Sequence, residues 1–413
     1  MSTQFSTPEN RDNLSAFATG TRSFLADHFL DSLGRMLAAG TLTIRYPDGH
    51  VREYRGKQPG PSAYLDIHDS VVARRTMTGG ALGFAESYMA GDCDSPDLTA
   101  VLELGAINED AFARRLDGKL LMRILHRFGH LLRPNTKRGS RRNISAHYDL
   151  GNEFYETWLD DSMTYSSALF GENPENLAEA QRSKYRRMAE IAGLRQGHKV
   201  LEIGCGWGGF ACFAAGEIGC DVTALTISDA QHDFAAARVQ REGLGERVKI
   251  VKRDYRDQQG RFDGIVSIEM FEAVGERYWP VFFDRVRENL SMGGRAALQI
   301  ITIADEFWPV YRKSADFIQA HIFPGGMLPC PSGLLDQFAR AGLSVIDDAG
   351  FGLDYARTLA VWRERFNEAW PRIAQMGFDD RFRRMWNYYL AYCEAGFRIA
   401  RIDVRQIALG HAS

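Results

Sequence analysis

Residues 201–209 read LEIGCGWGG: a short apolar segment with one acidic residue leads into a turn that holds four glycines. The segment has the composition of a buried strand, and GFACFAAGEIG at 209–219 is typical of a helix. Glycines between a strand and a helix allow the backbone to approach a nucleotide-containing cofactor closely. The stretch therefore predicts a nicotinamide dinucleotide site, an S-adenosylmethionine site, or a tight turn without a ligand.

The segments around this turn alternate between strand and helix patterns. Strand-like segments occur at 199–204, 221–228, 248–254, 262–270 and 294–303, and helix-like segments separate them. We expect the helix before the last of these strands to end near Met292-Gly293-Gly294, and long helices at 353–370 and 382–400. This alternation predicts an α/β fold with a mainly parallel, doubly wound sheet.

Two cofactor patterns fit the letters of the turn. The GxGxxG pattern of dinucleotide sites is satisfied by Gly204, Gly206 and Gly209. An acid-x-G-x-G-x-G pattern of methyltransferases is satisfied by Glu202, Gly204, Gly206 and Gly208. The turn alone therefore does not distinguish the two kinds of site.

The ends of the next two strands distinguish them. A dinucleotide site places an acid about 20 residues after the turn, at the end of the second strand. Thr226 and Ser228 stand there instead, and they also fit the cap of the following helix. Asp254 ends the third strand, a position that lies beside the adenine in a methyltransferase. We therefore interpret the turn as an S-adenosylmethionine site in a Rossmann-like class I methyltransferase domain, in preference to a nicotinamide-dependent reductase.

Composition and charge exclude several classes of protein. The chain of 413 residues, with 45% hydrophobic and 25% charged side chains, has the size for two domains and the composition of a globular protein. Its formal net charge of -3 indicates no strong attraction to nucleic acid. The six cysteines form no CxxC pair and no zinc-type spacing, so we expect no metal site. Without a signal-peptide pattern or an apolar run of about 18–20 residues, we expect a cytoplasmic protein.

Four regions follow one another along the chain. We expect a tail at 1–19, a small α+β domain at 20–110 with a hairpin around Pro47-Asp48-Gly49, a basic segment at 111–142, and the cofactor domain at 143–413 with a cap insertion at about 305–345. The basic segment holds ten Lys and Arg residues against one Asp. Its helical apolar spacing predicts either a solvated helix with an interdomain linker or a surface that rests on anionic lipid headgroups.

Several stretches together resemble one family, from about residue 80 to the end of the chain. They are SAHYDLGNEFYETWLDDSMTYSSALF (145–170), VLEIGCGWGG, LTISDAQ, DYRD, SIEMFEAVG (267–275), HIFPGGMLP (321–329), LDYARTLAVW and YYLAYCEAGFR. In this order they look like the cyclopropane-fatty-acid synthases, which include the mycolic acid cyclopropane synthases. The joint occurrence of eight blocks makes the resemblance specific.

The resemblance implies an activity and a substrate class. The enzyme would transfer a methyl group from S-adenosylmethionine to the cis double bond of an unsaturated acyl chain in a phospholipid, and ring closure would give a cyclopropane. Since no segment spans the membrane, it would dock peripherally on the inner face of the membrane. The small N-terminal domain could mediate a homodimer.

The resemblance also implies which residues contact the cofactor. Tyr148, Tyr165 and Ser166 would close over the methionine end. The glycine turn, with Glu202, Gly204, Gly206 and Gly208, would lie beneath it. The ribose, amino-acid and adenine parts would be contacted by Thr226, Ser228, Gln231, Asp254 and Tyr255.

The general base of the family is a bound bicarbonate ion, held by a Cys, a Glu, a His and a Tyr. Glu272 and Tyr355 match the Glu and the Tyr. Ser167 stands where the family has Cys, and Gln299 stands where it has His. A hydroxyl and an amide still bond an anion, but neither supplies positive charge.

These two departures bear on ring closure more than on methyl transfer. A cation beside a weaker or displaced base would lose a different proton, which gives a methyl- or methylene-branched acyl chain. A non-catalytic lipid-binding protein is a further alternative, which the departures favour and the intact cofactor blocks oppose. The sequence thus predicts a cyclopropane synthase, with branched-chain synthesis as the main alternative.

Overall fold

The computed structural model describes residues 28–116, 150–171, 176–313 and 315–412. The contacts between Cα atoms divide the chain into two compact units. The first unit comprises Met1–Met122 with Asp380–Tyr388, and the second comprises Arg123–Asp379 with Tyr389–Ser413. The domain limits expected from the sequence stay a prediction, and most of the basic segment at 111–142 lies outside the described residues.

The first unit contains a small four-stranded sheet with the order β2-β1-β3-β4. Its strands are β1 (Ala39–Arg45), β2 (Val51–Arg55), β3 (Gln58–Ile67) and β4 (Cys93–Asp94), and its helices are α2 (Val71–Ala90), α3 (Leu98–Ile107) and α4 (Glu109–Leu116). β1 and β2 form the predicted antiparallel hairpin, whereas β3 runs parallel to β1. Asp97 caps α3 by accepting a hydrogen bond from the Ala100 amide.

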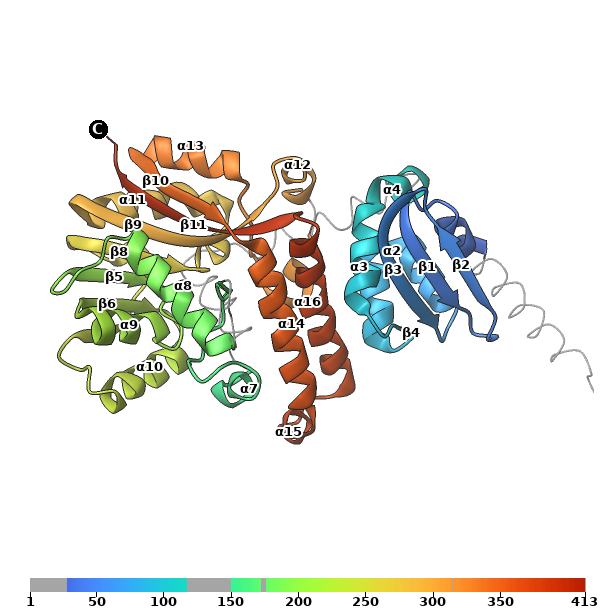
Figure 1. The fold of residues 1–413 in the computed structure, drawn as a ribbon, viewed down its shortest axis with the longest axis horizontal. Coiled ribbons are helices and arrows are strands. Elements are labelled where there is room, and N and C mark those ends of the chain that lie inside the picture. Colours follow the sequence, from blue (N-terminus) through green and yellow to red (C-terminus); the bar gives the residue numbers. More distant parts are fainter. Residues whose placement is uncertain (1–27, 117–149, 172–175, 314, 413) are drawn as a thin grey trace, which may run out of the picture. The chain divides into compact units, whose positions relative to one another are not determined.

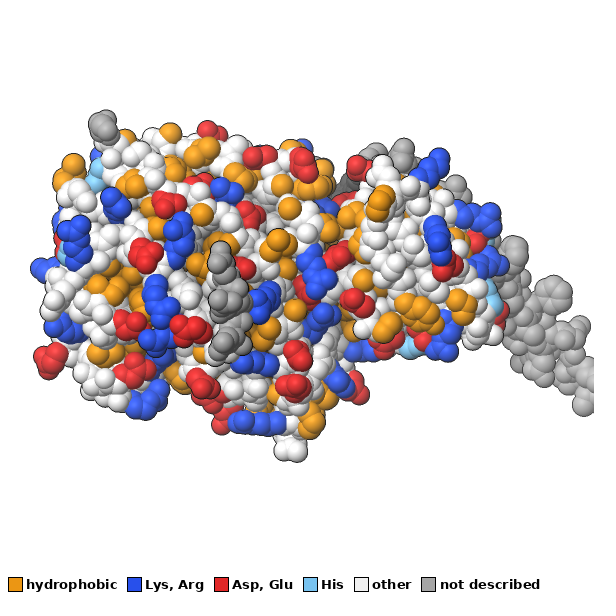
Figure 2. All heavy atoms as spheres, viewed as in Figure 1, with side chains coloured by type: hydrophobic (Ala, Val, Ile, Leu, Met, Phe, Trp, Pro, Cys, Tyr) orange, Lys and Arg blue, Asp and Glu red, His pale blue; other side chains and the backbone are white. Residues whose placement is uncertain are grey.

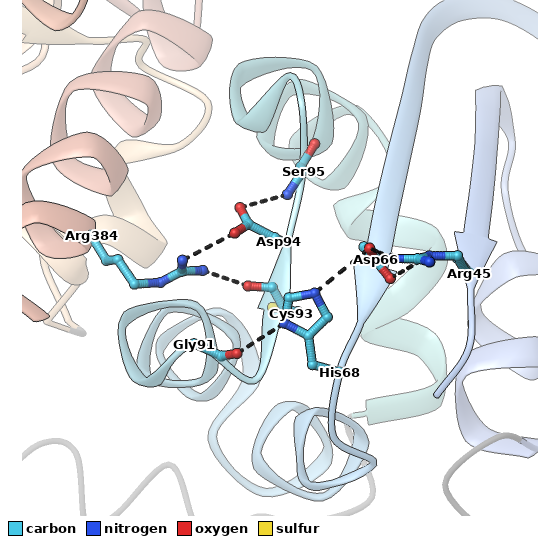
Figure 3. A network of polar contacts seen from close by, with 8 residues as sticks. All are labelled: Arg45, Asp66, His68, Gly91, Cys93, Asp94, Ser95 and Arg384. Carbon is cyan, nitrogen blue, oxygen red and sulfur yellow. Dashed lines mark hydrogen bonds and ion pairs between the residues drawn. The ribbon is translucent and has the colours of Figure 1, made fainter. Parts of the chain in front are cut away.

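Polar side chains stabilise the end of this small sheet (Figure 3). Arg384, from the part of α16 (Asp380–Arg398) that belongs to the first unit, donates to the Cys93 carbonyl at 2.6 Å and to the Asp94 carboxylate at 3.1 Å. Arg45 on β1 pairs with Asp66 on β3 at 2.9 Å. The short strand β4 is therefore held by charged hydrogen bonds as well as by its ladder.

The second unit is built on a seven-stranded sheet with the order β10-β11-β9-β8-β5-β6-β7 (Figure 1). Its strands are β5 (Lys199–Ile203), β6 (Asp221–Thr226), β7 (Val248–Lys252), β8 (Phe262–Ile268), β9 (Leu290–Ile303), β10 (Leu343–Gly350) and β11 (Ile402–His411). β5 to β9 run parallel, and β11 pairs antiparallel with β9 and β10. The predicted mainly parallel α/β sheet is confirmed.

Helices cover both faces of this sheet. The larger helices are α8 (Leu177–Ile191), α10 (Asp229–Arg241), α11 (Trp279–Asn289), α13 (Pro331–Ala341) and α14 (Gly352–Glu368), with α16 at the end. Shorter helices are α7 (Asn152–Glu156), α9 (Gly209–Phe213), α12 (Trp308–Tyr311) and α15 (Trp370–Gln375). Alternate residues of β5 enter different cores: Val200 packs with α8 and α9, whereas Leu201 and Ile203 pack with α11 and α13. Since both faces are buried, the strand is apolar on both sides, as in doubly wound sheets.

The expected boundary before β9 is wrong. α11 ends at Asn289, and Met292-Gly293-Gly294 already belongs to β9. The register with β8 shifts between Phe262 and Gly264, so a bulge accommodates the glycines that the sequence suggested for a helix end.

The surface of the described residues is mixed in charge. On the face drawn in Figure 2, basic and acidic side chains are interspersed over both units. Among the described helices, none is both long enough and apolar enough to cross a membrane.

Candidate functional site

The first residue after β8 adopts an unusual backbone conformation. Glu269 has a φ of 49°, in the left-handed region, which costs an ordinary residue about 1–2 kcal/mol. Its amide donates to the Gln299 carbonyl at 2.9 Å. The next side chain, Met270, packs on the glycine turn, since a Cβ on Gly204 would lie 2.6 Å from the Met270 Cγ. The loops after β5 and β8 therefore meet, at the carboxyl edge where parallel sheets bind ligands.

The Glu269 carboxylate accepts three hydrogen bonds from three separate parts of the chain. Its Oε1 accepts from the Ser167 amide at 2.8 Å and from the Gln299 Nε2, on β9, at 2.8 Å. Its Oε2 accepts from the Tyr355 hydroxyl, on α14, at 2.6 Å. Three of the four residues predicted to hold bicarbonate thus converge, but they converge on a carboxylate of the chain itself.

Burial raises the pKa of Glu269 above its usual range, and the three hydrogen bonds and the nearby charge of Lys184 oppose this effect. Burial and the negative Glu269 also raise the pKa of Tyr355 well above its ordinary value, which keeps this phenol a donor. The site therefore holds a half-buried carboxylate whose ionised form is stabilised by fixed donors.

Glu272, the residue predicted to bind bicarbonate, lies apart from this convergence. Its Oε1 accepts from the Ile301 amide at 2.6 Å, and its buried Oε2 has no hydrogen-bond partner in the structure. Burial, with the negative Glu269 nearby, raises the pKa of Glu272 to about 8. The two neighbouring carboxyl groups thus differ in their surroundings: Glu269 accepts from three fixed donors, whereas the pKa of Glu272 is raised to about 8.

A lysine lies buried on the other side of this site. Lys184, in the buried row of α8, donates from its Nζ to the Ser166 Oγ at 2.6 Å. Burial lowers its pKa to about 7, and the charges of Glu269, Asp160 and Glu202 oppose that shift. The Ser166 hydroxyl oxygen accepts from the ammonium, so its own proton stays available for an acceptor.

The glycine turn has the features of a cofactor cradle. A Cβ on Gly206 would meet no heavy atom within 4 Å, so open space lies beside this backbone. Glu202 is buried with its Oε2 unpaired, and burial raises its pKa to about 8. A cationic cofactor would supply the partner that this carboxyl lacks. The turn therefore fits S-adenosylmethionine, which carries a sulfonium and an ammonium group.

The remaining predicted cofactor residues lie at the ends of β6 and β7. Thr226 donates from its Oγ1 to the Gln231 Oε1 at 3.0 Å, and Ser228 caps α10 through the Gln231 amide at 3.3 Å. The Asp254 carboxylate accepts from the Arg256 side chain at 2.7 and 2.8 Å. Tyr255 is partly buried and stacks edge-on against Phe282. The Asp254 carboxylate is thus already paired, which leaves the adenine contact expected there a prediction.

Aromatic rings line the side of the site formed by residues 154–165 and α14. The Tyr165 hydroxyl lies 2.8 Å from the Tyr389 hydroxyl, and its ring contacts Trp158 and Trp362 at centroid distances of 5.5 and 5.3 Å. The Tyr355 ring stacks on Phe397 at 4.5 Å. Such π faces stabilise a cation nearby.

The side chain of Ser167, like that of Glu272, is not part of the convergence. Tyr148 lies outside the described residues. The Ser167 hydroxyl donates to the Ala168 carbonyl at 2.9 Å, so Ser167 serves the site through its backbone amide. Sequence reasoning missed Glu269 and Lys184. A signal existed for Lys184, because it lies at helical spacing among the buried residues of α8.

Comparisons with known proteins identify relatives of this chain. A family model described as mycolic acid cyclopropane synthetase matches residues 135–407. Tuberculostearic acid methyltransferase UfaA1 of Mycobacterium tuberculosis is 41% identical over 376 residues, which cover 89% of this chain and 87% of that protein. Cyclopropane-fatty-acyl-phospholipid synthase of Escherichia coli K12 is 36% identical over 349 residues, which cover 81% of this chain and 84% of that protein.

Solved structures agree with these relatives. The cyclopropane synthase MmaA2 from Mycobacterium tuberculosis matches with a TM-score of 0.62 at 28% identity, over 67% of this chain and 99% of that chain. The mycolic acid cyclopropane synthase CmaA1, complexed with SAH and CTAB, matches with a TM-score of 0.62 at 27% identity, over 68% of this chain and 99% of that chain. The predicted Rossmann-like methyltransferase fold is therefore confirmed.

Proposed function

On the premise that this chain belongs to the mycolic acid cyclopropane synthetase family, and is thus an S-adenosylmethionine-dependent methyltransferase of lipid acyl chains, we propose that its product is a methylene-branched acyl chain. The substrate is the cis double bond of an unsaturated acyl chain in a phospholipid. Glu269 is the general base, in place of bicarbonate. The support comes from the three hydrogen bonds that converge on Glu269.

Bicarbonate does not fit the site as these residues form it. The donors expected to hold it are the Ser167 amide, the Gln299 amide group and the Tyr355 hydroxyl, and all three donate to Glu269. A second anion among them would lie against a carboxylate, and like charges in a buried site repel strongly. No Cys or His is present at the two positions that would have added to its binding. In this proposal the Glu269 carboxylate therefore takes the role of the bound bicarbonate ion.

The cofactor supplies an electrophilic methyl group on a sulfonium, and the chain positions it and manages the charge that follows. With the cofactor bound, the π electrons of the acyl double bond would form a bond to the methyl carbon as the sulfur–methyl bond breaks. Positive charge then develops on the neighbouring chain carbon, where the rings of Tyr165, Trp362 and Tyr355 stabilise it.

Removal of the proton determines the product. A hydrogen moves with its electron pair from the methylated carbon to the cationic carbon, which places the charge at the branch point. Glu269 then accepts a proton from the new methyl group, and the electrons of that C–H bond form a double bond between the branch carbon and the former methyl carbon. Glu269 is held by its backbone and by three donors, so it cannot follow the cation, and this favours rearrangement before proton loss.

Structural identification of the product tests this function. The protein would be expressed in cells that lack the activity, and the new fatty acid would be purified. A methylene-branched chain and a cyclopropane have equal mass, so NMR must distinguish them. Vinyl proton signals are expected. Upfield cyclopropyl proton signals would establish ring closure and refute the proposal.

Dependence on dissolved bicarbonate provides a second, independent test. Activity of the purified enzyme in buffer freed of carbon dioxide is expected to equal its activity in bicarbonate-supplemented buffer. Stimulation by added bicarbonate would favour the alternative, a cyclopropane synthase in which an external anion displaces Glu269 from its donors.

Access to phospholipid requires that the enzyme meet the bilayer. We propose peripheral docking on the inner face of the membrane, with the basic segment at 111–142 as the contact, because ten cationic side chains there complement anionic headgroups. A homodimer through the N-terminal unit is a further proposal, which sedimentation of the purified protein would test.

A further inference from the structure

A second glutamine lies behind Gln299, and the mechanism above does not use it. Gln406 is on β11, directly opposite Gln299 on β9 in the antiparallel register. Its Nε2 donates to the Gln299 Oε1 at 2.9 Å, and both side chains are fully buried. Gln299 in turn donates from its Nε2 to Glu269 at 2.8 Å. A continuous chain of hydrogen bonds thus runs from β11 through β9 to the carboxylate.

The chemistry of the three side chains determines which group donates in each of these hydrogen bonds. An ionised carboxylate only accepts hydrogen bonds, so Gln299 must turn its NH₂ group toward Glu269. Its carbonyl oxygen then faces the side chain of Gln406 on β11. This position is buried, and an acceptor without a donor there would cost about 1–3 kcal/mol. Gln406 supplies that donor. Without it, the opposite orientation of the Gln299 amide would set its oxygen against the carboxylate.

Gln406 lowers the stability of the fold at this position, because it buries a polar atom that has no partner. Its own Oε1 is buried and has no hydrogen-bond partner in the structure. A methionine would fill a similar volume without a polar atom to bury, so stability alone does not favour glutamine here. The donor group of Gln406, and what it does to Gln299, is the remaining reason for this side chain.

We propose that Gln406 is a positioning residue, which locks the amide of Gln299 so that Glu269 stays fixed where it removes the proton. This proposal rests on the proposed function, in which Glu269 is the base. The other groups that face Glu269 are Lys184 from α8, Tyr355 from α14 and Glu272 from the same loop. They act on Glu269 independently of β11, so loss of Gln406 leaves them in place.

The test measures, in the Gln406→Met variant, which fraction of turnovers ends in the methylene-branched product. Each turnover releases one S-adenosylhomocysteine, whatever happens next to the cation. With Glu269 displaced, water adds to the cation and loses a proton, which gives a hydroxylated chain that is heavier by one water. We expect the ratio of methylene-branched product to S-adenosylhomocysteine to fall about tenfold, since one oriented hydrogen bond is lost. The acid limb of kcat/KM should move to higher pH, because Glu269 loses a well-placed donor.

Matched variants separate positioning from general damage. Thr302→Val removes a hydroxyl that is equally buried on β9 and does not contact Glu269, and it should leave the product ratio unchanged. Gln406→Asn keeps the amide but shortens its reach, so an intermediate ratio is expected. If Gln406→Met does not fold, as judged by thermal unfolding and S-adenosylhomocysteine binding, the Asn variant decides.

A double mutant localises the effect. In a Gln299→Met background, Gln406→Met should change neither the product ratio nor the acid limb further, because the relay is already broken. A wild-type ratio in Gln406→Met, or an effect of the same size in both backgrounds, would overturn the proposal. A cyclopropane product from the wild-type enzyme would instead refute the proposed function, whatever Gln406 does.

Discussion

Glu269 combines a left-handed backbone with a half-buried carboxylate that accepts three hydrogen bonds. A strained backbone is stable only where its surroundings hold it, and such residues cluster at functional sites. The carboxylate lies between α14 and the sheet, since it accepts from Tyr355 on α14 and from Gln299 on β9. The proposed base is thus held in place by the chain itself.

Replacing Glu269 by glutamine should abolish proton removal but preserve the fold. The Glu269→Gln variant keeps the volume of the side chain and removes the base, which contributes a factor of about 10²–10⁴ in rate. Formation of branched product, measured by NMR or gas chromatography, should fall by at least about 100-fold, whereas S-adenosylhomocysteine binding is retained. Glu288→Gln, on the exposed face of α11, is the control. Product formation at the wild-type rate in Glu269→Gln would rule out Glu269 as the base.

The second carboxyl predicts a pH dependence of stability. Burial raises the pKa of Glu272 from 4.5 in the unfolded chain to about 8 in the folded one. The folded state therefore holds a proton more tightly, and stability is lost as the pH rises from about 4.5 to about 8. Glu272→Gln removes this group. The difference in melting temperature between the variant and the wild type should therefore grow by several degrees from pH 5 to pH 8, at about 2–4 °C per kcal/mol. A constant difference across this range, measured by calorimetry, would contradict the assignment.

At the scale of elements, the site is made where β5 and β8 end side by side. The glycine turn after β5 and the strained loop after β8 touch through Gly204 and Met270. Gly204 has a φ of 83°, which disfavours any side chain, and a Cβ would also collide with Met270. The turn is therefore specified by packing as well as by the cofactor.

Gly204→Ala should destabilise the protein and weaken the cofactor site together. We expect a loss of about 1–3 kcal/mol in stability and weaker S-adenosylhomocysteine binding, measured by chemical unfolding and calorimetry. Met270→Ala in the same chain removes the collision but not the backbone strain, so it should recover part of the loss. Gly197→Ala, at a φ of 79° with no neighbour near its Cβ, reports the cost of the backbone alone. Equal losses in the Gly204 and Gly197 variants would show that Met270 plays no part.

The parallel part of the sheet could be predicted from the sequence, whereas the strands β10 and β11 and the hydrogen bonds of the site were not predicted. Apolar periodicity and the glycine turn predicted β5 to β8 and the helices between them, because these depend on local patterns. The end of α11 was misplaced, since glycines mark bulges as well as helix ends. Glu269 was missed because its role depends on Ser167, Gln299 and Tyr355, which lie 30 to 102 residues away in the chain. No local pattern reports such a convergence.

At the scale of the whole molecule, the proposed phospholipid substrate would require the enzyme to meet a lipid surface. The sequence places cationic residues in the segment at 111–142, and the formal net charge of the chain is only -3. Local rather than global charge would therefore govern contact with anionic lipid.

Charge reversal in this segment should weaken membrane binding. With Arg123→Glu and Arg127→Glu together, co-sedimentation with anionic phospholipid vesicles should fall by more than about tenfold, since each basic residue contributes about 1 kcal/mol near such a surface. Wild-type binding should also weaken as salt is added. Activity on a detergent-dispersed acyl substrate should stay unchanged. Vesicle binding that is insensitive to both changes would exclude this segment as the contact.

Burial shifts the pKa values of three groups around the cofactor site toward neutrality: that of Lys184 to about 7, and those of Glu202 and Glu272 to about 8. A cationic cofactor bound near Glu202 would favour the ionised carboxylate, and its binding would then release a proton into solution. The heat of binding then contains the heat with which the buffer takes up that proton. Calorimetry in phosphate and in Tris would give two different apparent enthalpies for one binding event, and their difference would count the protons that the site exchanges.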